Sequence, residues 1–219
     1  MAVRDALLAL LTAGPAYGFQ LHGGLADRTG GRRAINVGQT YATLERLTKQ
    51  GLVEPAGSTD DGLPLHRLTA AGRAAAAAWL EGADAAGADS WDETVDRVLI
   101  AQSLPDWNAA AVVAAERARW VTRRDEASVA AGMPPPPTER NGPGVDADVG
   151  EAALGRLAAA ADVARAEAAL SWLDSVGRAE RRPFAPRSER PRRGRRPGSA
   201  TAVGADVDTG DAAQASARA

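Results

Sequence analysis

The sequence predicts a mainly α-helical protein with one small β-hairpin, in which a winged helix-turn-helix is followed by a helical C-terminal region. Two observations predict this fold. Apolar residues recur at helical spacing through most of the chain, and between residues 52 and 68 two short apolar strands flank a cluster of turn residues. Alanine is abundant, and because it favours helix but buries little area, we expect modest cores.

The first two predicted helices are short. The first is marked by apolar residues at spacings of three and four, namely Val3, Ala6, Leu7, Leu10 and Leu11. Gly14 and Pro15 should end it, because glycine favours the residue after a helix and proline favours the first turn of the next one. We expect the second helix from about Ala16 to Arg28, with Tyr17 on its apolar stripe.

The third helix should start at Asn36, whose side chain can cap it while Gln39 reaches back, as in a capping box. Gly51 stands where the residue after a helix commonly lies. The predicted inward stripe consists of Val37, Tyr41, Leu44 and Leu47. The predicted outer face carries groups able to donate to base edges and phosphates, which are Gln39, Thr40, Thr43, Arg46 and Lys49.

A hairpin and a fourth helix complete this unit. We expect a strand over Leu52–Glu54, a turn over Pro55–Gly62 and a second strand over Leu63–Leu68. Thr69 can then cap an alanine-rich helix that continues to about Glu81.

Three stretches occur in order over residues 3–80, and they read LLALLTAGPAYGFQL, VGQTYATLERLTKQGLVE and LPLHRLTAAGRAA. They resemble the turn into the second helix, the recognition helix and the second wing strand of the PadR family of bacterial transcriptional regulators. The resemblance implies a winged helix-turn-helix that binds double-stranded DNA. It also implies that the helical C-terminal region makes a homodimer.

The outer face of the third helix and this resemblance together predict a set of DNA-binding residues. The set is Tyr17, Gly38, Gln39, Thr40, Tyr41, Thr43, Arg46, Lys49, His66 and Arg67. Each of the two tyrosines can either donate to phosphate or pack in the core with its hydroxyl at the rim, and both interpretations stay open. Arg67 on the wing should contact phosphate, with His66 beside it.

The C-terminal part should be three helices. Ser90 and Glu93 predict a capping box for the first, and Asp106 can cap the second after Pro105 breaks the chain. The second helix should run to about Ala131. The prolines of residues 132–149 predict an extended spacer, after which a long helix should end near residue 179.

These patterns divide the chain into three regions, a DNA-binding domain at 1–82, a dimerisation and effector region at 90–180, and a tail at 181–219. Residues 1–82 carry a net charge of +1, residues 83–180 of -8 and residues 181–219 of +5. The middle region is therefore a poor partner for nucleic acid. The tail holds many arginines and prolines and almost no large apolar groups, so we expect it to be disordered. It either adds phosphate contacts or is a passive, solvated segment.

Several classes of function have no support in the sequence. There is no cysteine, and His22 and His66 are the only histidines, so a zinc site is not expected. No phosphate-binding loop and no nucleophile–base pair is recognisable, so we expect neither a cofactor nor an enzyme. Neither a signal peptide nor a membrane-spanning run is apparent, so we expect a cytoplasmic protein with no membrane partner.

The function predicted from the sequence is a homodimeric repressor that binds a pseudo-palindromic operator and is released by a small aromatic effector. Five tryptophans in a chain with few other aromatic residues either form the effector site or fill core between alanine-rich helices. The alternative function is a winged-helix protein-interaction module without specific DNA readout. Such a module should show apolar or acidic residues on the outer face of the third helix.

Overall fold

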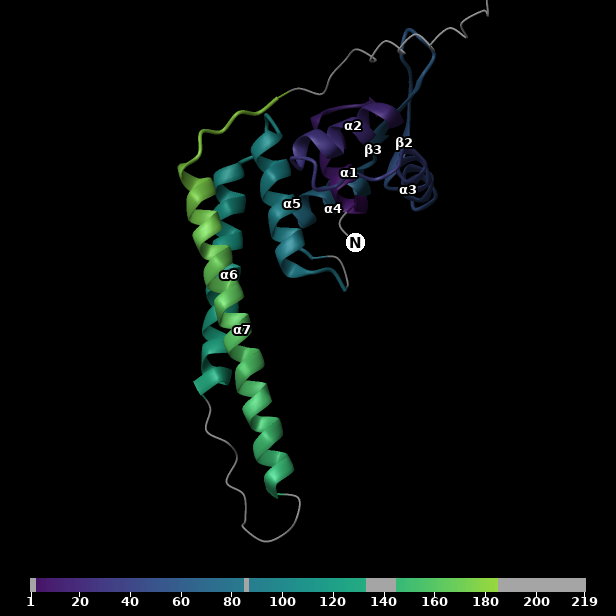
Figure 1. Cartoon of the computed structure of the whole chain (residues 1–219). Helices are drawn as coiled ribbons and strands as arrows, with labels where there is room; N and C mark the ends of the chain where they lie inside the picture. Colours follow the sequence, from purple (N-terminus) through teal and green to yellow (C-terminus); the bar gives the residue numbers. More distant parts are fainter. Residues whose placement is uncertain (1–2, 85–86, 133–144, 185–219) are drawn as a thin grey trace, which may run out of the picture. The chain divides into compact units, whose positions relative to one another are not determined.

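The computed structural model describes residues 3–84, 87–132 and 145–184, with the backbone alone over residues 145–149. The chain is mainly helical with a small antiparallel sheet, as predicted (Figure 1). The elements in order are α1 (Val3–Leu10), a short 3-10 helix (Leu11–Ala13), β1 (Ala16–Tyr17), α2 (Gly18–Arg28), α3 (Val37–Lys49), β2 (Val53–Ser58), β3 (Pro64–Leu68), α4 (Ala70–Leu80), α5 (Ser90–Ser103), α6 (Ala109–Gly132) and α7 (Val145–Arg178).

The sheet corrects two predicted boundaries. Ala16 and Tyr17 form β1 and pair antiparallel with β3, so α2 begins only at Gly18. The first wing strand extends to Ser58 instead of ending at Glu54, because β2 stays paired with β3 across an irregular register. Both differences arise from pairing between strands, which helical periodicity and turn composition do not record.

The predicted cap of α3 is confirmed. The side-chain oxygen of Asn36 accepts the Gln39 backbone N–H at 2.8 Å, and the Gln39 side chain accepts the Asn36 N–H at 3.3 Å. After α3, Gly51 has a φ of +69°, which is the left-handed conformation expected of a residue that follows a helix. The start and end of the predicted recognition helix are thus fixed by local contacts.

The core of the N-terminal domain is built around α1. Leu7, Leu8 and Ala9 are completely buried, and α1 contacts α2, α4 and α5. The alanines of α4 let it approach α1 closely, with Ala76 and Leu80 fully buried between them. Because small side chains let two helix backbones come close together, the alanine-rich sequence yields a core that buries little apolar area but is closely packed.

A compact junction joins α3, the wing and α4. The Thr69 hydroxyl donates to the carbonyl of Gly51 at 2.7 Å and accepts the N–H of Gly72 at 3.0 Å, which confirms Thr69 as the cap of α4. The Thr69 N–H donates to the carbonyl of Leu52 at 3.1 Å. A Cβ on Gly72 would lie 1.9 Å from that same carbonyl oxygen, so only glycine fits at this position.

The helix starts in the C-terminal region differ from the prediction. Asp89, not Ser90, caps α5, because its carboxylate accepts the N–H groups of Trp91 and Asp92. Asn108 takes the role predicted for Asp106, since its side chain accepts the N–H of Ala111. In each case several residues with capping side chains stand close together, and the sequence alone does not say at which of them the backbone turns into the helix.

α6 and α7 lie side by side in opposite directions (Figure 1). The predicted spacer of residues 132–149 is too wide at both ends, because α6 includes Gly132 and α7 already begins at Val145. The proline-rich residues 133–144 of this prediction lie outside the described residues.

The predicted tail also begins too early. The Phe184 N–H donates to the carbonyl of Ser103 at 3.1 Å, and the Phe184 carbonyl accepts from Arg28 at 2.9 Å. Arg181 donates to the carbonyls of Leu104 and Trp107. Residues 181–184 are therefore held by specific hydrogen bonds, whereas the rest of the predicted tail, residues 185–219, lies outside the described residues.

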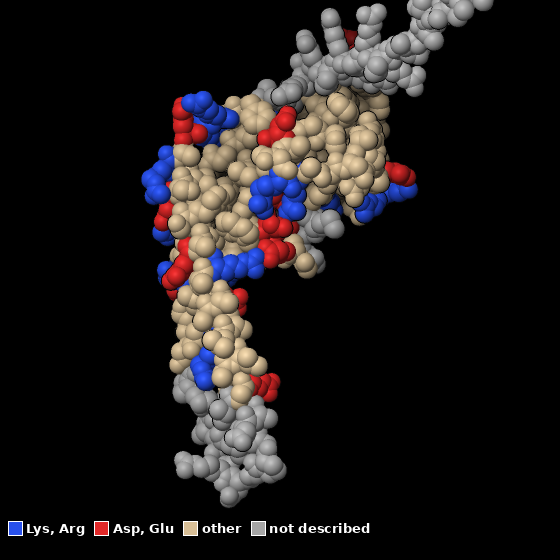
Figure 2. All heavy atoms as spheres, in the orientation of Figure 1, with Lys and Arg blue, Asp and Glu red and all other residues tan. Residues whose placement is uncertain are grey.

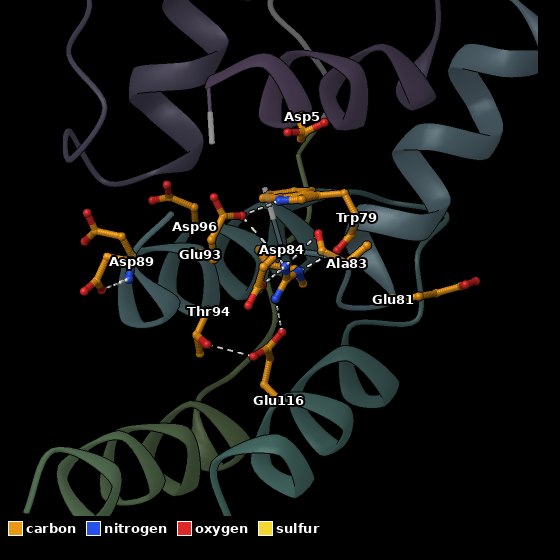
Figure 3. A network of polar contacts seen from close by, with 12 residues as sticks. Asp5, Trp79, Glu81, Ala83, Asp84, Asp89, Glu93, Thr94, Asp96 and Glu116 are labelled. Carbon is orange, nitrogen blue, oxygen red and sulfur yellow. Dashed lines mark hydrogen bonds and ion pairs between the residues drawn. The ribbon is translucent and has the colours of Figure 1, made fainter. Parts of the chain in front are cut away.

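A buried polar network joins α4, α5 and α6. Arg97 of α5 has no exposed surface, and its guanidinium donates to Glu116 of α6 and to Asp84. Arg97 also donates to the carbonyl of Trp79, whose indole N–H donates to Glu93 at 2.6 Å. Figure 3 shows these carboxylates between the helices. Because a buried charge is costly unless it is paired, this network specifies how the three helices meet.

Three of the five tryptophans connect helices of the C-terminal half. Trp91 of α5 lies edge-on to Trp120 of α6 and to Trp172 of α7, with ring centroids 6.2 and 5.2 Å apart. The Trp120 indole donates to Thr94 at 2.9 Å. These contacts favour the interpretation in which tryptophans fill core between alanine-rich helices.

The junction around Gly72 provides a first test. Gly72→Ala should lower the free energy of unfolding by about 1–3 kcal/mol, because the added methyl forces the Leu52 carbonyl away from α4. The control is Gly23→Ala in α2, where nothing lies within 4 Å of the added Cβ and stability should rise by about 0.5–1 kcal/mol. Urea unfolding of the full chain measures both, and equal effects would contradict the junction.

The two buried glutamates around Arg97 should respond oppositely to neutralisation. Burial raises the pKa of Glu93, so its contribution to stability is full below the ordinary glutamate pKa and is lost as pH rises through the raised value. Burial also acts upward on the pKa of Glu116, but hydrogen bonds and charges from Arg119, Arg97 and Thr94 outweigh it and lower that pKa. The contribution of Glu116 is therefore present at neutral pH and is lost in acid.

Glu116→Gln should consequently destabilise the protein by about 3–5 kcal/mol at pH 7, because it removes the charge that pairs with Arg97. Glu93→Gln should be neutral or stabilising at pH 7, because the amide oxygen can still accept from Trp79, the buried charge at position 93 is removed, and Arg97 keeps its partner Glu116. Chemical unfolding at pH 7 and pH 4 measures this, and the difference between Glu116→Gln and the wild type should shrink at pH 4. A large loss from Glu93→Gln at pH 7 would contradict the assignment.

Candidate nucleic-acid interface

The helix α3 presents a different face from the predicted one. Thr40 is fully buried and Thr43 nearly so, together with Leu44 and Leu47. Val37 and Tyr41 are 42% and 47% exposed, although they were predicted to face the core. Thr40 is turned inward against α2, where its hydroxyl lies 3.4 Å from His22 Nδ1. The inward stripe is therefore rotated toward the threonines, because spacings of three and four allow more than one stripe through Leu44 and Leu47.

The exposed part of α3 still carries most of the predicted contacts. Gly38, Gln39 and Tyr41 are exposed in the first turns, and Arg46 and Lys49 in the last turns. Arg46 donates to the hydroxyl of Thr43 at 3.1 Å, so buried Thr43 positions this cation. The structure thus brings together amide, hydroxyl and cationic groups on one helix, as direct readout of bases and phosphate binding require.

The two tyrosines of the predicted set lie in different environments. Tyr17 is buried in β1, which favours the core interpretation for this residue. The ring of Tyr41 covers Gly18 at the start of α2, where an added Cβ would lie 2.5 Å from the ring. Tyr41 therefore packs one side of its ring against α2 while nearly half of its surface remains open to a partner.

Two cations of the predicted set, Lys49 on α3 and Arg67 on the wing, form exposed ion pairs. Lys49 contacts Glu45 at 2.6 Å, and this hydrogen bond lowers the pKa of Glu45. Arg67 on the wing contacts Glu54 at 2.8 Å across the β2–β3 pair. Exposed pairs of this kind contribute little to stability, so a phosphate can replace the carboxylate at small cost.

His66 differs from its neighbour on the wing. It is half-buried, burial lowers its pKa, and its Nδ1 has no hydrogen-bond partner within the described part of the chain. The imidazole is therefore neutral at pH 7 and does not add positive charge to the wing. This is consistent with the prediction that His66 lies beside the Arg67 contact instead of making it.

A hollow of about 450 Å³ runs beside α3, between this helix and the start of α1. Its polar lining includes Arg4, Gln39, Arg46 and Gln50. The predicted set omitted Arg4 and Gln50, which the structure places in this lining. On the face shown in Figure 2, basic and acidic side chains of the described residues lie interspersed and do not gather into a patch of one sign.

The loop before α3 contains two further residues that the sequence reasoning did not assign, Arg32 and Arg33. Both contact acidic side chains of α5, among them Asp96, as described below. The sequence shows two adjacent arginines just before the α3 cap, and this could have marked them as candidates. It could not show that their partners lie on α5, because no spacing rule connects residues 60 positions apart.

Other kinds of site find no support in residues 3–84, 87–132 and 145–184. Within these ranges no group of three or more acidic or histidine side chains is arranged to hold a metal ion. Across the same residues, none of the helices combines the length and the apolar character needed to cross a bilayer.

Comparison with known proteins agrees with the motifs. Residues 7–78 match the model of the transcriptional regulator PadR-like family. Similar solved structures include Bacillus subtilis PadR in complex with operator DNA, with 17% identity, coverage of 80% of this chain and 96% of that chain, and a TM-score of 0.35. The same protein with p-coumaric acid gives 18% identity, coverage of 80% and 93%, and a TM-score of 0.33. No curated protein matches the chain.

At such TM-scores the likeness in shape adds nothing to the family match, which rests on the winged-helix residues themselves. That match confirms the resemblance seen in the three sequence motifs. Over residues 7–78, its winged-helix part, the chain therefore matches the PadR-like family of transcriptional regulators.

Proposed function

We propose that this protein is a homodimeric repressor that binds a pseudo-palindromic operator through α3 and releases it when a small aromatic effector binds. The observation that carries the proposal is the exposed side of α3, where Gln39, Arg46 and Lys49 stand free of the core on a helix that is capped at both ends. In a dimer, two such helices would enter successive major grooves about 34–36 Å apart. As a regulator of genes, the protein would act in the cytoplasm.

The proposed dimer contact lies on α7. Leu154 and Leu157 are 68% and 67% exposed, and they continue into exposed Ala161, Ala164 and Ala168 along one side of the helix. These positions follow a spacing of three and four, as in the seam of a coiled coil. Another side of α7, which includes Ala166 and Leu173, is already buried. A second copy of this chain would cover the exposed stripe.

The proposed effector would bind next to the tryptophans of the C-terminal half. A hollow of about 420 Å³ there is lined by Trp120, Arg123 and Arg165 among others. The Arg123 guanidinium lies 5.1 Å from the centroid of the buried Trp120 ring, so Arg123 and Arg165 are the groups of this lining that could hold a planar anionic compound, beside the acidic Glu126 and Asp162. Quenching of tryptophan fluorescence together with release of DNA across a panel of such compounds would support this part of the proposal.

A protein-interaction module remains the second candidate, because α3 exposes the apolar groups Val37 and Tyr41. Asp60 and Asp61 at the tip of the wing are also exposed and would repel phosphate. Selection of duplexes from a random pool separates the two functions. Enrichment of a repeated half-site supports the regulator, whereas no enrichment at low salt supports the module.

The exposed residues of α3 should divide into two kinds. Gln39→Ala should reduce the difference in binding free energy between selected and random DNA by about 1–3 kcal/mol, because it removes a contact to a base edge. Lys49→Ala should weaken binding to every sequence and reduce the salt slope by about one, because it removes a phosphate contact. Titrations with a selected and a random duplex at several salt concentrations measure both effects.

The control for charge is Arg124→Ala on α6, which removes an exposed cation far from α3 in the sequence. It should leave both affinities unchanged. If Gln39→Ala and Lys49→Ala alter selected and random DNA equally, the division of roles on α3 is wrong.

The dimer contact is tested by placing charges on the α7 stripe. The double change Leu154→Glu and Leu157→Glu should convert the dimer to a monomer, because it buries like charges against one another in the proposed seam. Sedimentation equilibrium gives the mass. Ala160→Glu, at an exposed position beside the stripe, is the control and should leave a dimer. A dimer in both variants would place the contact elsewhere.

A further inference from the structure

The loop between α2 and α3 is held by two aspartates of α5. The Arg33 side chain donates from Nε to Asp96 at 2.5 Å and lies 3.4 Å from Asp92. Arg32 donates to Asp92 at 2.9 Å, and its Nε is 3.9 Å from Asp96. Two cations from the loop thus meet two carboxylates one helical turn apart, and we call these four residues the α5 clamp.

The inner half of the α5 clamp is unusual for a surface loop. Asp96 has no exposed surface, and its Oδ1 lacks a hydrogen-bond partner among the described residues. Burial raises the pKa of Asp96, whereas the hydrogen bond and charge of Arg33 act in the opposite direction. The carboxylate therefore depends on Arg33 for its charge, and Arg33 is drawn toward α5 and away from solvent.

Backbone contacts hold the clamp to the end of α2, and the chain leads from the clamp directly into α3. The N–H of Arg33 donates to the hydroxyl of Thr29 at 3.1 Å, and the N–H of Arg32 donates to the carbonyl of the same residue. Asn36, the cap of α3, follows only three residues after Arg33, and Gln39 completes that cap. The position of Arg33 therefore bears on the first turn of α3 through the three residues of chain that connect them, and the proposed base contact lies in that turn.

The direction of the Asp96 side chain supports a dedicated role. It lies on the side of α5 away from Glu116, so it takes no part in the contacts that hold α5 to α6 (Figure 3). α5 is thus joined to α6 by Arg97 and to the loop before α3 by the adjacent residue Asp96.

We propose that Asp92 and Asp96 are positioning residues for DNA reading, which hold Arg32 and Arg33 so that the first turn of α3 is placed for sequence-specific contacts. The proposal rests on α3 being the DNA-reading helix. The clamp has a second effect, since it neutralises two loop cations that would otherwise bind any phosphate. Loss of the clamp therefore lowers specific affinity while non-specific affinity stays the same or rises, which a simple loss of folding does not produce.

The test uses the full chain and two duplexes, one selected from a random pool by the wild-type protein and one random. Asp96→Asn should lower the ratio of specific to random affinity by about tenfold, comparable to one lost base contact. Asp92→Asn removes only the exposed half of the clamp and should lower the ratio less. Combining Asp96→Asn with Arg33→Gln should cost less than the sum of the single changes, because both remove one contact.

Two controls make the result specific to the clamp. Asp174→Asn breaks the exposed Arg117–Asp174 ion pair between α6 and α7 and should not alter the ratio. Asp96→Glu keeps the negative charge, so its ratio of specific to random affinity should lie between those of Asp96→Asn and the wild type. Hydrogen exchange should speed up at the amides of residues 36–41 in Asp96→Asn, and the thermal midpoint of Asp92→Asn shows whether that variant folds.

Each outcome decides the matter. If Asp96→Asn fails to fold, a folded Asp92→Asn with a reduced ratio still supports the clamp, and an unchanged ratio overturns it. Equal loss of specific and random binding in a folded variant also overturns it. If the wild-type protein selects no sequence from the pool, the proposed function is wrong. If the wild-type protein selects a sequence and the clamp variants bind it with the same ratio, only the clamp proposal is wrong.

Discussion

The buried guanidinium of Arg97 is the interaction on which the arrangement of the C-terminal helices depends. Its neighbours Glu93, Glu116 and Asp84 come from α5, α6 and the loop after α4. A charge without access to water must have partners with suitable geometry, and only one relative placement of these elements supplies them. The network gives specificity that alanine-rich packing does not give, since small side chains fit many helix–helix registers.

α5 is one element through which the two halves of the chain meet. The side chains of adjacent residues in a helix point about 100° apart, so Arg97 and Asp96 contact different neighbours. The first binds Glu116 of α6, and the second binds the loop that leads into α3. A movement of α6 and α7 that shifts α5 would therefore also reach the loop before α3, the helix proposed to read DNA.

The N-terminal domain obtains its rigidity from local contacts at the ends of its elements. The Asn36–Gln39 capping box fixes the start of α3, and Thr69 ties the end of α3 to the start of α4. Gly18 and Gly72 permit two close approaches, one to the Tyr41 ring and one to the Leu52 carbonyl. The exposed side of α3 is therefore presented by a scaffold whose turns have little freedom.

The sequence by itself determined the features that depend on near neighbours. The winged helix, the capping box at Asn36, the cap at Thr69 and the turn at Gly51 follow from residues within a few positions of one another, as does the family resemblance. Of the candidate site, the sequence identified the cations and Gln39 on α3.

Only the tertiary structure decided which side of α3 is buried. Thr40 faces α2 and Tyr41 faces outward, because the stripe is chosen by the partner helix and not by the hydrophobicity of α3 alone. Pairing with β3 turned Ala16 and Tyr17 into a strand. The contact of Arg33 with Asp96 joins positions 63 apart in the chain, and such contacts arise only when separate elements pack together.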